Sequence, residues 1–120
     1  MAEKMIVVCN GDEAKNIMPT LIFASSGLSL DHEVYVFFCP AGAKWTLKGE
    51  LEKIGEPKGL PNPVKLFNDI LELGGRVVLC ELALENKGIE PKDLRDGRIL
   101  IEKAPPFLMA AEGATMTFTF

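Results

Sequence analysis

The chain has 120 residues, room for one hydrophobic core, and its composition of 48% hydrophobic and 25% charged residues is typical of a globular protein. We therefore expect a single domain over residues 1–120. The net charge of −4, with lysines scattered along the chain, argues against a nucleic-acid partner, because phosphate binding needs clustered Lys and Arg.

The start of the sequence and its cysteine content bear on location. Residues 1–4 lack the basic segment, long apolar stretch and small-residue cleavage site of a secretory signal. No apolar run reaches the length of about 20 residues that a membrane helix needs. Three cysteines are an odd number, which excludes a complete intramolecular disulfide framework and favours a reducing compartment. We expect a cytoplasmic protein without a membrane span.

The first half of the chain predicts strands alternating with helices. Residues 5–9 are a short apolar run closed by an Asn-Gly turn, as in a buried strand. Apolar residues recur at helical spacing over 12–30. Residues 33–39 are rich in β-branched and aromatic side chains and end at Pro40, which predicts a second buried strand. A helical pattern resumes over 44–54.

The second half repeats this alternation after an exposed loop. The expected elements are a loop at 55–63, helices at 64–73, 82–88 and 105–111, and strands at 76–80, 98–101 and 114–120. The last strand alternates Thr with apolar residues, which predicts a strand at the edge of the sheet or one with only one face fully buried. Strand–helix repetition calls for parallel strands. The predicted fold class is α/β, a three-layer α/β/α sandwich with a mainly parallel sheet of about five strands.

The three cysteines, Cys9, Cys39 and Cys80, fall at the carboxyl ends of predicted strands. Ligands bind at that edge of open parallel sheets, although cysteine is also among the most buried residue types and often belongs to the core. Cys80 has the strongest case, because it ends a strand where a helix begins and helix N-terminal amides stabilise a thiolate. The carboxylate of Glu81 opposes this effect if it points the same way.

Three stretches carry a family resemblance. Gly75 to Ile89 resembles the DsrE/DsrF-like family, in which a strand-terminal cysteine begins a helix that ends in Gly-Ile. Phe37 to Gly42 is similar to the family's Phe-Phe-x-x-x-Gly strand end, and Asp93 to Gly97 resembles its Asp-Leu-x-Asp-Gly turn. Cys39 stands where the family usually has another residue. The resemblance spans most of the chain.

The resemblance implies a sulfur-transfer protein. Cys80 would accept sulfane sulfur as a persulfide and relay it to another thiol, with a TusA-like or rhodanese-like carrier as partner and a trimer or hexamer as the assembly. Candidates for a second thiol are Cys39 and Cys9. Residues expected to line the pocket are Asn10, Gly11, Gly42 and Glu81.

Other functions stay open at this point. The chain could be a non-catalytic oligomeric binding or regulatory module, or a thiol redox sensor in which Cys39 and Cys80 form a disulfide, which needs Cα atoms within about 7 Å. The sequence does not decide whether the chain is an enzyme, which would then be a sulfurtransferase. There is no Cys-x-x-Cys pair, and the one histidine, His32, lies at the opposite end of its strand. No metal and no cofactor are expected.

Overall fold

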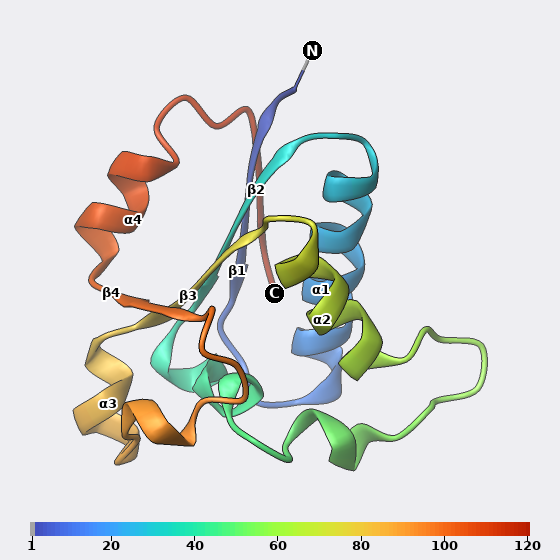
Figure 1. Cartoon of the computed structure of the whole chain (residues 1–120), viewed down its shortest axis with the longest axis vertical. Coiled ribbons are helices and arrows are strands. Elements are labelled where there is room, and N and C mark those ends of the chain that lie inside the picture. The colour runs from blue at the N-terminus through green and yellow to red at the C-terminus, as the bar shows by residue number, and fades with distance from the viewer. Residues whose placement is uncertain (1) are drawn as a thin grey trace.

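The computed structural model describes residues 2–120. Within these residues, the centre of the fold is a five-stranded parallel sheet with the order β4-β3-β2-β1-β5 (Figure 1). The strands are β1 (Lys4–Cys9), β2 (Glu33–Phe38), β3 (Arg76–Cys80), β4 (Leu100–Glu102) and β5 (Met116–Thr119). The predicted α/β class and mainly parallel sheet are confirmed, and β5 is an edge strand, as its alternating pattern predicted.

Helices lie on both sides of the sheet, as predicted (Figure 1). The long helices α1 (Ala14–Ser29) and α2 (Pro63–Glu72) pack together on one side. The short helix α4 (Ala104–Ala110) lies on the other side, and α3 (Leu82–Lys87) follows the carboxyl end of β3. None of the helices in residues 2–120 is long and apolar enough to cross a membrane.

The segment 44–54 is not the helix that its apolar spacing predicted. It forms two 3₁₀ helices, η1 (Pro40–Thr46) and η2 (Leu51–Ile54), and a third, η3 (Pro91–Asp93), precedes β4. Between η1 and η2, Leu47 has an extended backbone, with φ −89° and ψ 152°, and pairs with Leu94 in an isolated antiparallel bridge. Contacts with a distant part of the chain therefore override the local helical pattern.

Side chains on the two faces of the sheet form two cores of different size. The larger core, between the sheet and α1 and α2, contains Phe38 and Phe67. The smaller core lies beneath α4 and joins four buried residues, Phe37, Val78, Cys80 and Phe107. Alternate residues of β2 and β3 thus enter opposite cores, which explains why their sequences are continuously apolar.

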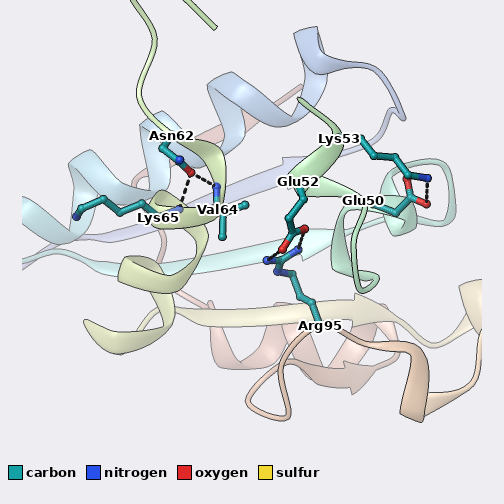
Figure 2. Close-up of polar contacts among 7 residues, drawn as sticks. All are labelled: Glu50, Glu52, Lys53, Asn62, Val64, Lys65 and Arg95. Atoms are coloured by element: carbon teal, nitrogen blue, oxygen red, sulfur yellow. Dashed lines mark hydrogen bonds and ion pairs between the residues drawn. The ribbon is translucent and has the colours of Figure 1, made fainter. Parts of the chain in front are cut away.

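A bidentate pair of hydrogen bonds joins η2 to the loop before β4 (Figure 2). Arg95 Nη1 and Nη2 donate to Glu52 Oε1 and Oε2, each at 3.1 Å. The Arg95 guanidinium also lies over the ring of Phe67, 5.4 Å from its centroid. The hydrogen bonds that Arg95 donates lower the pKa of the Glu52 carboxyl. This contact holds the irregular segment against the larger core.

Helix α2 begins at a side-chain cap. Asn62 Oδ1 accepts hydrogen bonds from the amides of Val64, at 2.9 Å, and Lys65, at 3.1 Å (Figure 2). Replacing an Asn cap by Ala costs about 1 kcal/mol. We expect Asn62→Ala to lower the free energy of unfolding, measured by urea denaturation, by about that amount. Asn62→Ser, which keeps an acceptor, should lose much less; equal losses in both variants would rule out the cap as the cause.

Candidate functional site

Cys80 ends β3, an interior strand of the sheet. Its side chain is 5% exposed and packs in the smaller core with Phe37, Val78 and Phe107. Phe107 comes from α4, so this helix covers the thiol on one side of the sheet. The predicted acceptor thiol therefore lies at the carboxyl edge of the sheet, just beneath the surface.

Cys39 lies between the end of β2 and the start of η1. Phe38 and Leu79 are the last paired residues of the parallel β2–β3 ladder, and Cys39 and Cys80 are the residues that follow them. Cys39 is half-buried and packs against the same small core as Cys80. The amide of Cys39 donates to the carbonyl of Cys9 at 3.1 Å, so the backbone continues in register beyond the end of β2. Cys39 and Cys80 are thus adjacent on one face.

Cys9 belongs to the opposite face. It is 0% exposed and lies in the larger core, and its Sγ donates to the carbonyl of Gly11 at 3.7 Å. A Cβ atom on Gly42 would stand only 2.5 Å from the carbonyl oxygen of Cys9, so glycine is required for this close approach. Burial raises the pKa of the Cys9 thiol. Cys9 therefore has the environment of a structural cysteine.

The residues expected to line the pocket have different neighbours in the structure. Gly11 and Gly42 surround Cys9, and the Gly11 carbonyl also accepts a hydrogen bond from Trp45 Nε1 at 3.0 Å. Asn10 is exposed, and its amide donates to the carbonyl of Phe120 at 2.7 Å.

Glu81 stays beside Cys80. It is exposed, and its amide donates to the carbonyl of Glu102 at 2.9 Å. The first amide after Cys80 is therefore taken by β4. The Glu81 amide is therefore not available to an anion on the thiol, and α3 itself begins at the next residue, Leu82.

A charged pair that the sequence did not predict includes the ladder partner of Cys80. Glu102 pairs with Cys80 in the β3–β4 ladder, and its Oε2 accepts a hydrogen bond from Arg76 Nη2 at 2.7 Å. Within residues 2–120, Glu102 Oε1 and Arg76 Nε are buried without a hydrogen-bond partner. No sequence signal marks Glu102, because only the register of β4 brings it to Cys80.

An open groove lies along the chain segments that follow Cys39 and Cys80. It has a volume of about 490 Å³ and is lined by Pro40, Leu82, Glu85 and Asn86. Pro40 follows Cys39, and Leu82 comes two residues after Cys80, so the groove lies along the chain segments that leave the two strands. Elsewhere in residues 2–120, as in this groove, no cluster of three or more His, Cys, Asp or Glu side chains is arranged to hold a metal ion.

The fold and the thiols together define a class, an α/β protein with cysteines at the carboxyl edge of a parallel sheet. The model of the DsrE/DsrF-like family matches residues 3–116. The chain belongs to the DsrE/DsrF-like family, as the sequence motifs predicted.

A curated relative is similar to most of this chain. It is the uncharacterized protein MJ0760 of Methanocaldococcus jannaschii, 34% identical over 95 residues, which are 79% of this chain and 34% of the relative. The chain thus spans about a third of the length of this relative.

The environment of Cys39 raises the pKa of its thiol. Burial raises the pKa of this thiol, and the negative charges that Cys80 and Cys9 carry as thiolates raise it further. A raised pKa means less thiolate at neutral pH, so we expect the rate of iodoacetamide alkylation of Cys39 to reach half its maximum above the ordinary pH for a thiol. Peptide mass mapping over a pH series measures this rate.

Cys80→Ser removes one of these charges. We expect the pH midpoint for Cys39 to fall in this variant, because a serine hydroxyl stays neutral. Cys9→Ser is the matched control, and its effect should be smaller. A midpoint for Cys39 that does not move in Cys80→Ser would contradict the proximity of the two thiols.

Proposed function

We propose that this protein is a sulfur carrier that accepts sulfane sulfur on the thiol of Cys80 and relays it as a persulfide to another thiol. The observation that carries this proposal is the position of Cys80, at the end of an interior strand, in a small core against which a second thiol, Cys39, also packs. Parallel α/β sheets bind their ligands at this edge. Membership of the DsrE/DsrF-like family supports the same role.

The proposed step is a thiolate exchange. The Cys80 thiolate attacks the outer sulfur of a persulfide donor, a new S–S bond forms, and the donor leaves as a thiolate. Attack by an acceptor thiol on the outer sulfur of the Cys80 persulfide reverses the exchange and restores the Cys80 thiolate. The sulfane sulfur keeps its oxidation state throughout, so neither step needs a cofactor.

The charged pair beside Cys80 fits this chemistry. A lone carboxylate would disfavour the thiolate through charge repulsion. The ion pair with Arg76 offsets the charge of Glu102, and within residues 2–120 Glu102 Oε1 is left without a hydrogen-bond partner. Arg76 and Glu102 are positioning residues in this proposal.

The proposed partner is a protein that presents a persulfide, of the TusA-like or rhodanese-like kind. Because Cys80 is only 5% exposed, its sulfur has to meet the donor through the groove at the strand ends. The three cysteines of the described chain are free thiols, which fits a reducing cytoplasm. We propose that residues 1–120 act there as a single domain.

The low exposure of Cys80 also favours a second candidate, a non-catalytic oligomeric binding or regulatory module. In that case Cys80 is a core residue and resists alkylation in the folded protein. A thiol redox sensor would instead form a sulfenic acid or a disulfide when treated with peroxide.

Intact mass tests the sulfur carrier. Wild type, Cys80→Ala and the matched control Cys9→Ala are incubated briefly with polysulfide, thiosulfate or a persulfidated carrier and weighed under non-reducing conditions. Wild type and Cys9→Ala should gain whole sulfur atoms that reduction removes, and the mass of Cys80→Ala should not increase. A chain that gains no sulfur from any donor, with Cys80 resistant to alkylation, is the binding module instead.

Helix α4 supports self-association. Its outer surface carries Leu108, 57% exposed, and Met109, 75% exposed, and no charged residue lies between Lys103 and Glu112. A helix that is apolar all round is normally covered on all sides. We propose that α4 contacts further copies of this chain, in a trimer or hexamer.

Light scattering tests this assembly. Met109→Glu should lower the molar mass of the particle, because a carboxylate at a contact between copies is desolvated without a partner. Leu30→Glu is the matched control, since Leu30 is 68% exposed at the end of α1, on the other side of the sheet. A wild-type monomer at every concentration would overturn the assembly.

A further inference from the structure

Cys39 and Cys80 are placed to react with each other. Phe38 and Leu79 are paired residues of β2 and β3, and the two cysteines follow them on the same face of the sheet. Neighbouring strands lie about 4.8 Å apart, so the residues directly after the last pair, Cys39 and Cys80, start from a spacing like the 4.4–6.8 Å, roughly, between the Cα atoms of disulfide-bonded cysteines. The third cysteine, Cys9, enters the opposite core and is not part of this pair.

The two thiols differ in access. Cys80 is 5% exposed, whereas Cys39 is half-buried and reaches the surface of the small core. An acceptor protein must enter the groove to meet a persulfide on Cys80, but Cys39 is already beside it. The nearest nucleophile for anything bound to Cys80 is therefore within the same chain.

We propose that Cys39 discharges the persulfide of Cys80 as hydrosulfide and forms a Cys39–Cys80 disulfide. This inference rests on the proposed function, since it begins from a persulfide on Cys80. It adds a second activity, the reduction of sulfane sulfur by a dithiol within one chain.

The step balances in atoms and electrons. The Cys39 thiolate attacks the inner sulfur of the persulfide, which is the sulfur of Cys80 itself. The bond between Cys39 and Cys80 forms, the bond between Cys80 and the outer sulfur breaks, and the outer sulfur leaves as hydrosulfide with the hydrogen it already carries. The sulfane sulfur gains two electrons, which the two cysteine sulfurs lose. A small-molecule dithiol resets the protein by reducing the disulfide.

The discharge competes with relay to a partner. When an acceptor thiol reaches the outer sulfur first, the sulfur is passed on and both cysteines stay reduced. When no acceptor thiol arrives, Cys39 attacks the persulfide of Cys80 and the outer sulfur leaves as hydrosulfide. The disulfide occupies Cys80 and prevents further loading until a dithiol reduces it.

The test follows the fate of the bound sulfur. Wild type, Cys39→Ser and the matched control Cys9→Ser are loaded with polysulfide under anaerobic conditions and desalted, so that the bound sulfur is the only oxidant. Intact mass and released hydrosulfide are then measured over time. Wild type and Cys9→Ser should lose the added sulfur, release one hydrosulfide per discharged chain and become two hydrogens lighter than the reduced protein. Cys39→Ser should keep the added sulfur, and peptide mapping of wild type should show the Cys39–Cys80 link.

Two contrary results have different meanings. If wild type and Cys39→Ser both load and keep their sulfur equally, or lose it equally, the discharge by Cys39 is wrong and the sulfur carrier stands. If neither protein loads and the wild-type mass does not change, the sulfur carrier itself is wrong.

Discussion

The pairing of β2 with both β1 and β3 is the constraint on which the rest of the structure depends. β2 is the middle strand of the sheet, and its register aligns Cys9 with Phe38, and Phe38 with Leu79. The ends of three strands therefore lie level at one edge. A shift of one residue would turn every side chain of a strand to the other face. Such a slip of β3 would move Cys80 into the larger core, away from Cys39.

The two faces of this sheet are covered unequally, and Cys39 and Cys80 lie on the side with less helical cover. Helices α1 and α2 have 16 and 10 residues, whereas α4 has 7. On the α4 side, Ile6, Val8 and Tyr35 remain half-exposed. The larger core gives the molecule its stability, because most of the buried apolar side chains lie there. The α4 side leaves reactive groups near the surface.

The charged pair of Arg76 and Glu102 leaves buried polar atoms without hydrogen bonds. Among residues 2–120, the buried side-chain polar atoms that lack a hydrogen-bond partner both belong to Arg76 and Glu102. Proteins satisfy nearly all such atoms, and exceptions call for an explanation, for example a catalytic role. Here the exception adjoins the proposed sulfur acceptor, because Glu102 and Cys80 are paired residues.

The sequence by itself determined the fold class, the family and the presence of cysteines at strand ends. Short apolar runs ended by Gly, Pro or Asn locate parallel strands, because both faces of such strands are buried. Local pattern failed over 44–54, where pairing of Leu47 with Leu94 prevents a helix. Only the tertiary structure decided the strand order, the separation of Cys9 from the other thiols, and the place of Glu102 beside Cys80. These depend on the register between strands distant in sequence, which no local pattern encodes.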